Sequence, residues 1–364
     1  NENVVITISH LGYIKRTSLT EYKLQNRGGT GSRGSKTRDA DFLEQMFVAK
    51  THNYLLIFTE KGKCFWMRVF EIPEGTKTSK GRATQNLINI TSDDKVLAYI
   101  SVKDLKDEEY INNNFLLMCT RKGVIKKTTL EAYSRPRQNG INAISIREGD
   151  QLLEARLTSG SDEILMAVKS GKAIRFNESK VRPMGRNAAG VRGIRLNGPK
   201  DEVVGMVCVK DAESDILVVS KNGYGKRSSV DDYRITNRGG KGVKTITITD
   251  KTGELIAIKN VGDNNELMII NQAGVVIRLD ASSIRTMGRA TQGVKLINLR
   301  GDDSIAAVAV VEKDSEETIT DESEIDNLSD IEGIVDNEID TGNEDDRNER
   351  GEDESENDNE ESEE

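Results

Sequence analysis

The feature that most constrains the fold of this chain is a short pattern that recurs six times. Each copy has an apolar run rich in β-branched residues, then a turn with glycine, then a second run that ends in a basic residue. A glycine between two such runs predicts a β-hairpin, because one position of the turn needs a positive φ. The copies read VVITISHLGYIKRT, YLLIFTEKGKCFWM, FLLMCTRKGVIKKT, EILMAVKSGKAIRF, ILVVSKNGYGKRSS and ELMIINQAGVVIRL, with glycines at Gly12, Gly62, Gly123, Gly171, Gly223 and Gly274.

Further short apolar runs follow each hairpin, such as AISI, GIRL and KLINL, which gives about four strands per copy. No long amphipathic helical pattern is evident, so we expect an all-β body over residues 1–311. Repetition around an axis would protect the strand edges, as in a propeller-like disc of six four-stranded blades. A stack of hairpins or two separate sandwiches are the alternatives. The expected repeats cover residues 4–53, 54–114, 115–162, 163–214, 215–265 and 266–311.

Charge divides the chain into two parts. Residues 312–364 hold 26 acidic residues against three basic ones, a net charge of −23, whereas the preceding 311 residues carry +14. The acidic part has no aromatic residue and only scattered aliphatic ones. It cannot bury enough apolar surface to offset the entropy of ordering. We therefore expect a basic folded body followed by a disordered acidic tail, residues 312–364.

A basic residue recurs four positions after the turn glycine in five of the six copies, and copy two has Trp66 there. In a closed disc these residues would form a positive belt, although each alone could be a solvated strand end. Aromatic side chains are only 4% of the chain, which favours duplex over single-stranded nucleic acid. We expect phosphate contacts from Arg16, Lys127, Arg175, Arg227 and Arg278, and from the neighbouring Lys15, Lys126 and Lys226.

A glycine-rich loop, QNRGGTGSRG, spans residues 25–34. Its glycines match the spacing of a dinucleotide-binding turn and nearly that of a P-loop, but the strand–turn–helix context is missing and the P-loop spacing fails. We interpret it as a loop whose backbone approaches a phosphate chain while nearby arginines supply charge. A second version, NRGGKG at 237–242, contains Arg238 and Lys241. The alternative is a tight turn with incidental arginines.

Little in the sequence supports catalysis. Only His10 and His52 are present, and no metal-binding or nucleophile motif occurs. The three cysteines are isolated in apolar runs and are expected to be buried, reduced thiols. No cofactor is expected in this chain. No long apolar span or signal peptide is evident, which favours the cytosol and no membrane contact. The chain does not begin with Met, so we expect a fragment of a longer protein.

The loop QNRGGTG resembles the gyrase box, Q-R-R-G-G-K-G, of the C-terminal domain of the DNA gyrase A subunit. Asn26 and Thr30 depart from that box and remove two positive charges. The resemblance extends over residues 3–311 and includes VFEIPEGTKTSKGRATQNL, KKTTLEAYSRPRQNGINAISIREGD, GKAIRFNESKVRPMGRNAAGVRGIRL, GYGKRSSVDDYRITNRGGKGVKT and MGRATQGVKLINL. It implies DNA contacts by Gln25, Arg27, Gly28, Gly29, Gly31 and Arg33.

That resemblance implies a six-bladed β-pinwheel that wraps duplex DNA around a basic rim, with the box joining the first and last blades. It implies that the whole enzyme is an ATP-dependent type II topoisomerase that introduces negative supercoils. The strand-cleaving tyrosine would lie in an N-terminal domain absent from this sequence, and ATP and Mg would bind in the holoenzyme.

The partners implied are the N-terminal part of the gyrase A subunit and the gyrase B subunit, in a heterotetramer of the bacterial cytoplasm and nucleoid. The isolated domain would be a monomer. Two alternatives stay open: the related subunit of topoisomerase IV, a decatenase, and a propeller that acts as a protein-interaction scaffold.

Overall fold

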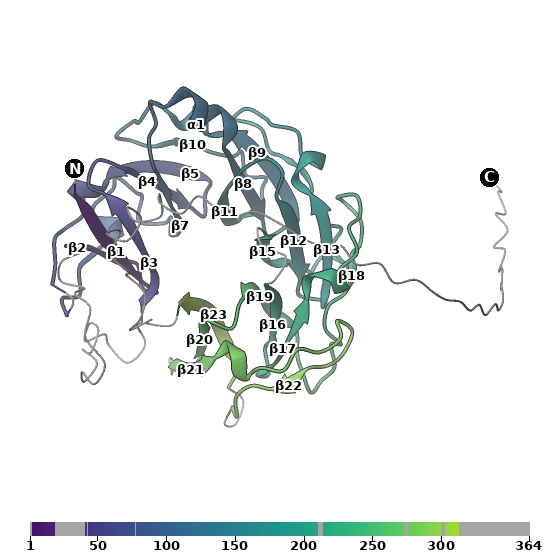
Figure 1. Cartoon of the computed structure of the whole chain (residues 1–364). Helices are drawn as coiled ribbons and strands as arrows, with labels where there is room; N and C mark the ends of the chain where they lie inside the picture. The colour runs from purple at the N-terminus through teal and green to yellow at the C-terminus, as the bar shows by residue number, and fades with distance from the viewer. Residues whose placement is uncertain are drawn as a thin grey trace, which may run out of the picture. The chain divides into compact units, whose positions relative to one another are not determined.

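The computed structural model describes residues 2–18, 41, 43–76, 78–209, 214–272, 276–299 and 303–312. All of these residues belong to the first of the two units into which the chain divides, Asn1–Glu317. Within this unit the blades follow one another in sequence order around a common axis (Figure 1). The expected all-β ring of six antiparallel blades is confirmed.

The strands of each blade are given from the inside of the ring outwards. Blade one contains β3 (Leu43–Lys50), β1 (Asn3–Ser9), β2 (Tyr13–Ser18) and β6 (Arg82–Ala83). Blade two contains β7 (Val96–Val102), β4 (Tyr54–Thr59), β5 (Lys63–Arg68) and β10 (Ile141–Asn142). Blade three contains β11 (Leu152–Thr158), β8 (Phe115–Thr120), β9 (Val124–Thr129) and β14 (Val191–Arg192).

The same order continues in the second half of the ring. Blade four contains β15 (Val203–Val209), β12 (Glu163–Val168), β13 (Lys172–Asn177) and β18 (Val243–Lys244). Blade five contains β19 (Leu255–Val261), β16 (Asp215–Ser220), β17 (Tyr224–Ser229) and β22 (Val294–Lys295). In blade six the described strands are β23 (Ile305–Glu312), β20 (Asn265–Asn271) and β21 (Val276–Asp280).

The fourth strand of blades one to five comes from the next copy of the repeat, so blades exchange strands with their neighbours. The exchanged strand has only two residues, and the carbonyl of the hairpin glycine anchors its end. Gly123 O accepts the N–H of Gly193 at 2.8 Å, and Gly171 O accepts the N–H of Thr245 at 2.8 Å. The repeat thus builds four-stranded blades as expected, but copies two to six each contribute their third strand in sequence order to the preceding blade.

The order of the strands within each sheet determines which strands lie near the axis of the ring and which lie at its outside. The innermost strands contact one another around the axis, from β7 to β11, β15, β19 and β23, and β23 also contacts β3 of blade one. The exchanged strands β6, β10, β14, β18 and β22 lie at the opposite, outer end of each sheet. The segments that lead into them therefore run over the outer side of the ring.

Two short helical features accompany the strands. In blades two to six a 3-10 turn follows the second strand of the hairpin: η2 (Val69–Glu71), η4 (Leu130–Tyr133), η5 (Glu178–Lys180), η6 (Val230–Asp232) and η7 (Ala281–Ser283). A further 3-10 turn, η3 (Thr84–Asn86), follows β6. The α-helix α1 (Glu108–Asn113) was not expected. It lies between β7 and β8, and its N-cap Asp107 accepts the N–H of Tyr110 at 3.0 Å. This insertion accounts for the longer spacing between Gly62 and Gly123.

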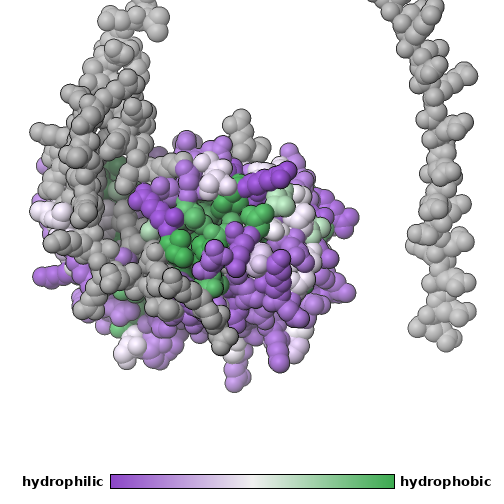
Figure 2. All heavy atoms as spheres, turned by 90° about the horizontal axis from the view of Figure 1, so that it is seen from below, coloured by the Kyte–Doolittle hydropathy of each residue, from purple (hydrophilic) through white to green (hydrophobic). Residues whose placement is uncertain are grey.

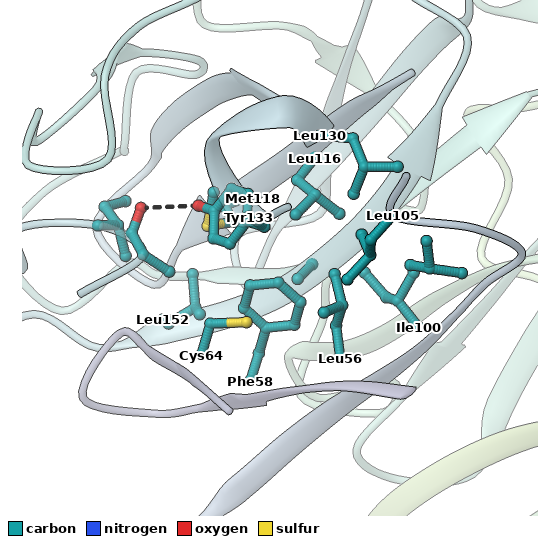
Figure 3. Close-up of a cluster of buried hydrophobic side chains, with 14 of the residues drawn as sticks. Leu56, Phe58, Cys64, Ile100, Leu105, Leu116, Met118, Leu130, Tyr133 and Leu152 are labelled. Atoms are coloured by element: carbon teal, nitrogen blue, oxygen red, sulfur yellow. Dashed lines mark hydrogen bonds between the residues drawn. The ribbon is translucent and has the colours of Figure 1, made fainter. Parts of the chain in front are cut away.

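The core lies between neighbouring blades. Figure 3 shows the cluster between blades two and three, where Leu56 and Phe58 pack toward Leu116 and Met118. The Tyr133 hydroxyl lies in the same cluster and donates to Ala143 O at 3.2 Å. Equivalent apolar clusters join blades one and two, three and four, four and five, and five and six. Each fully buried aliphatic side chain contributes about 1.5–3 kcal/mol, so these clusters dominate the stability of the ring.

The face of blade six that points away from blade five carries a smaller apolar cluster. Ile270 and Ala309 are buried there, with Met268 and Ala307 packed against them. On the side of the ring seen in Figure 2, the described surface is mostly hydrophilic, with one apolar area.

Of the thiols, Cys64 and Cys119 are buried and Cys208 is half-buried, and all three are free. Burial raises the pKa of all three thiols, that of Cys208 to about 12, which disfavours the nucleophilic thiolate at neutral pH.

Replacing Gly190 by Ala should destabilise the ring. Gly190 lies in the segment that leads into β14 and has φ +92°. A Cβ atom there would lie 2.7 Å from Ile125 O of β9. We expect a loss of more than about 1 kcal/mol in the free energy of unfolding, measured by urea titration. Gly185 lies in the same segment with nothing within 4 Å of its Cβ position. Gly185→Ala should change stability by less than about 0.5 kcal/mol, and equal effects of the two substitutions would contradict this account.

Candidate nucleic-acid interface

The recurring basic residue lies at the joint between blades in copies one, three, four and five. Its side chain donates to a carbonyl of the 3-10 turn in the next copy or just after it. Arg16 Nε donates to Ile72 O at 2.8 Å, Arg175 Nη1 to Val230 O at 2.7 Å, and Arg227 Nη1 to Ala281 O at 3.0 Å. Lys127 Nζ donates to Glu178 O at 3.2 Å. The repeated position therefore staples each blade to the next copy.

Carboxylates complete these staples. Arg227 pairs with Asp215 at 3.0 Å and with Asp263 at 2.7 Å, and its side chain is only 9% exposed. Lys127 lies 3.6 Å from the buried carboxylate of Glu178. A buried ion pair is tolerated when its remaining polar atoms are also hydrogen-bonded. Glu178 meets this condition, because Thr158 Oγ1 donates to it at 2.6 Å.

Copy two shows what the staple requires. Trp66 replaces the basic residue, and its indole Nε1 donates to Tyr133 O at 2.9 Å. An indole has one N–H donor and no charge. The shared requirement of this position is thus an N–H donor that reaches the next copy, and positive charge is secondary to it.

The lysine one position earlier is also directed inward. Lys15 Nζ donates to Thr76 O and Ser79 O, both at 2.8 Å. Lys126 Nζ donates to Ala143 O at 2.6 Å and to Arg186 O, and Lys226 Nζ to Gly288 O at 2.6 Å and to Arg289 O. Burial is the main cause that lowers the pKa of Lys126 to about 8 and that of Lys226 to about 8, with a nearby arginine as the second cause.

The expected exposed belt therefore needs correction. Lys15, Lys126, Lys127, Lys226 and Arg227 are buried, and Arg16, Arg175 and Arg238 are partly buried. Their donors are directed to backbone carbonyls and carboxylates, because an ammonium or guanidinium group inside the ring must be hydrogen-bonded. Of the ten expected contact residues that the structure describes, only Lys241 and Arg278 are exposed. Arg278 pairs with Glu266. DNA contact by these ten residues stays a prediction.

The exposed positive charge lies instead on the segments that lead into the exchanged strands, which we call the straps. They comprise residues 73–83, 134–142, 181–192, 234–244 and 284–295, and they hold 15 basic residues and one acid, Glu74. Ten of these cations are exposed: Arg82, Arg135, Arg137, Arg182, Arg192, Arg234, Lys241, Lys244, Arg285 and Lys295. Because the straps run over the outer side of the ring, they form a basic rim. Sequence reasoning predicted only Arg238 and Lys241 among the strap cations, although Gly-Val followed by Arg or Lys recurs at 190–192, 242–244 and 293–295.

Hydrogen bonds join straps three to five to residues that lie just after the preceding strap. Ser145 Oγ donates to Asn187 O at 2.7 Å, and Thr247 Oγ1 donates to Ala290 O at 2.6 Å. The loop NRGGKG in the fourth of these straps makes similar links, since Gly240 O accepts the N–H of Arg195 at 2.8 Å. Arg238 donates to Lys180 O at 2.9 Å and to Arg192 O at 3.0 Å. The rim is therefore held in shape by hydrogen bonds from side chains and main chain to carbonyl groups of the neighbouring copy.

The first glycine-rich loop lies outside the described residues. This holds for Gln25, Arg27, Gly28, Gly29, Gly31 and Arg33, whose predicted contacts stay predictions. Within the described part of the chain, no group of three His, Cys, Asp or Glu could hold a metal ion. None of the helices described is long and apolar enough to cross a membrane.

Replacing Arg227 by Met should chiefly affect stability. The change removes the staple and leaves Asp215 without its ion-pair partner, with only the Thr286 hydroxyl still donating to it, which should cost about 3–5 kcal/mol in the free energy of unfolding. Arg278→Met is the matched control, because the Arg278 side chain is 55% exposed, and it should cost less than about 1 kcal/mol. Urea titration at neutral pH measures both. A stable Arg227→Met protein would show that the staple does not hold the blades.

The buried lysine should make stability depend on pH. The pKa of Lys226 is about 8 in the ring and about 10.4 in an unfolded chain. Between these values the unfolded chain binds more protons, so Lys226 makes the free energy of unfolding rise with pH in this window. Lys226→Met should reduce that rise between pH 8 and 9.5, measured by urea titration at each pH. Lys241→Met, at an exposed lysine, should leave the slope unchanged; equal slopes in all three proteins would contradict the assignment.

Comparison with known proteins agrees with this architecture. The family model of the DNA gyrase C-terminal domain, beta-propeller, matches residues 3–50, 53–103, 114–159, 162–210, 214–261 and 265–312. The DNA gyrase A subunit of Staphylococcus aureus strain MRSA252 is 45% identical over 322 residues, which cover 88% of this chain. The relative from strain NCTC 8325 is 45% identical over 330 residues and 90% of this chain. The chain spans only 36% and 37% of the length of these two relatives.

Solved structures show the same fold. A C-terminal domain of DNA topoisomerase IV superposes with a TM-score of 0.75 at 26% identity, covering 85% of this chain and 94% of that one. A DNA gyrase A C-terminal domain superposes with a TM-score of 0.63 at 26% identity, covering 85% and 99%. The six matched repeats and the identity to the gyrase A subunit place this chain in the family of the DNA gyrase C-terminal domain, beta-propeller.

Proposed function

We propose that this ring binds duplex DNA and wraps it around the straps, largely independently of sequence, as the C-terminal part of a DNA gyrase A subunit. The observation that carries the proposal is the charge of the straps, 15 basic residues against one acid. Such a surface neutralises phosphates without reading bases. Bending about 40 bp through a half-turn costs roughly 10 kcal/mol. A rim of five basic straps offers a series of contacts to offset that cost.

In the whole enzyme we propose that this wrapping supports ATP-dependent negative supercoiling. The ring would act with the N-terminal part of the gyrase A subunit and with the gyrase B subunit, which would bind ATP and Mg. Under this proposal the protein would act in the bacterial cytoplasm, associated with the nucleoid. The relatives of 45% identity are named as the A subunit of DNA gyrase, which favours this role.

A second candidate is the related subunit of topoisomerase IV. It is favoured by the superposition on that enzyme's C-terminal domain, whose TM-score of 0.75 exceeds the 0.63 of the gyrase domain. The departures at Asn26 and Thr30 from the gyrase box also favour it. Supercoiling and decatenation by the assembled enzyme distinguish the two roles, because only gyrase should introduce negative supercoils.

Wrapping itself can be tested by DNA topology. A plasmid relaxed by a topoisomerase in the presence of the full chain, then freed of protein, should retain a shift in linking number. Arg182→Gln, Arg192→Gln and Arg234→Gln together should abolish most of this shift, because they remove three exposed strap cations. Lys50→Gln, Lys103→Gln and Lys106→Gln, at exposed lysines outside the straps, form the matched control and should keep it. No shift with the unmodified chain, or equal loss in both triple variants, would sink the proposal.

A further inference from the structure

The two faces of the ring carry different turns. In each blade the glycine hairpin joins the two middle strands, such as β4 and β5, at one edge of the blade, which we call the turn edge. The 3-10 turns follow the second strand and therefore lie at the opposite edge. Both edges are in reach of a duplex on the rim, so the charges at each decide where along the height of the rim the duplex lies.

At the turn edge of blade four, two lysines face one another. Lys172, the first residue of β13, is paired directly with Lys244 of the exchanged strand β18. Like charges directly opposed across two strands are destabilising. Neither lysine forms an ion pair with a carboxylate of the described chain, and Lys244 is exposed. An anion held between them would remove this repulsion.

The equivalent place in blade five is a hollow of about 460 Å³. Three exposed lysines line it: Lys221 of the hairpin turn, Lys251 of the loop before β19, and Lys295 of the exchanged strand. Lys295 is paired directly with Tyr224, and Lys251 Nζ lies 5.4 Å from the centre of the Tyr224 ring. Asn222 Nδ2 fixes the loop by donating to Asp250 O at 3.0 Å and to Lys251 O at 3.2 Å.

The hollow has little negative charge of its own. Asp303 is the one carboxylate among its described lining residues, and it is already engaged. Ser304 donates its N–H to Asp303 Oδ1 at 2.8 Å, and Asn271 Nδ2 donates to Asp303 Oδ2 at 2.6 Å. The three lysines form no ion pair with a described carboxylate. Three lysines that line one hollow beside an aromatic ring suit a phosphodiester, which is a compact anion with several acceptor oxygens.

The opposite edge differs in its charged residues. The 3-10 turns and the neighbouring loops carry exposed carboxylates at Glu108, Glu109, Glu131, Asp231, Asp232 and Asp263. The turn edge has exposed carboxylates too, at Asp93, Glu148, Asp250 and Glu254. What distinguishes the turn edge of blades four and five is the cluster of lysines that form no ion pair with a described carboxylate.

We propose that the lysines at the turn edge of blades four and five are phosphate sites, and that a bound duplex lies toward the turn face of the ring. The set consists of Lys172 and Lys244 in blade four and Lys221, Lys251 and Lys295 in blade five. This inference rests on the proposed function and adds the height at which DNA crosses the rim. The contacts are made to the backbone and carry no sequence preference.

Lysine footprinting tests the height of the duplex directly. The full chain is acetylated with a limiting amount of an N-hydroxysuccinimide ester, with and without a duplex long enough to wrap, and each lysine is quantified by mass spectrometry. The duplex should protect the five turn-edge lysines several-fold and leave Lys50, Lys103 and Lys106 unchanged. Protection of Lys241 without protection of the five would overturn the inference and leave DNA binding intact. No protection anywhere would overturn both.

A salt titration supplies the second readout. Lys221→Gln, Lys251→Gln and Lys295→Gln together should lower the magnitude of the slope of log K against log salt by about 0.9 for each phosphate that the protein no longer neutralises. The triple control at Lys50, Lys103 and Lys106 should keep the slope of the unmodified chain. An unchanged slope in the turn-edge variant, with normal folding by circular dichroism, would count against the sites even if affinity fell.

Discussion

Every blade from one to five depends on a strand that another copy supplies. The anchor of that strand is one main-chain hydrogen bond, from the exchanged segment to the carbonyl of a hairpin glycine, as between Gly193 and Gly123. A positive φ at the glycine allows the turn, and the absence of a side chain lets the neighbouring segment approach. The exchange covers the outer edge of each sheet, where an unpaired strand would otherwise attract another chain.

The same exchange explains why so much positive charge is turned inward. A strap that crosses the edge of a foreign blade presents carbonyls that no strand can satisfy, and buried carbonyls need donors. Lys126 and Lys226 supply them from the second strand, to Arg186 O and Gly288 O. Arg175 and Arg227 donate to carbonyls of the 3-10 turns that precede the straps. The basic residues thus divide into two groups within a few positions of sequence. One group satisfies the backbone at the joints, and the other lies on the straps and faces solvent.

Sequence reasoning predicted the hairpins well, because the spacing of the glycines and of the apolar runs is strong evidence for them. It could not predict the exchange, since a strand such as Val243–Lys244 is too short to show any periodicity. It also placed Arg227 on the surface. The same sequence pattern, a basic residue at the end of a strand, occurs when the side chain reaches solvent and when it reaches the next copy. The helix α1 has six residues, which is shorter than a helical pattern needs to be recognised. Only the cap residue Asp107 and the two glutamates after it indicate its start.

The exchange also sets an order for biosynthesis. The outer strand of blade three, Val191–Arg192, is encoded after the hairpin of blade four, which ends at Asn177. A chain that emerges from the ribosome therefore cannot finish a blade until most of the next copy has been translated. Folding trails translation by one repeat, and the nascent chain always carries one incomplete sheet. A ribosome that pauses within a strap holds that unpaired edge open, which makes the straps the points where slow translation would most readily lead to misassembly.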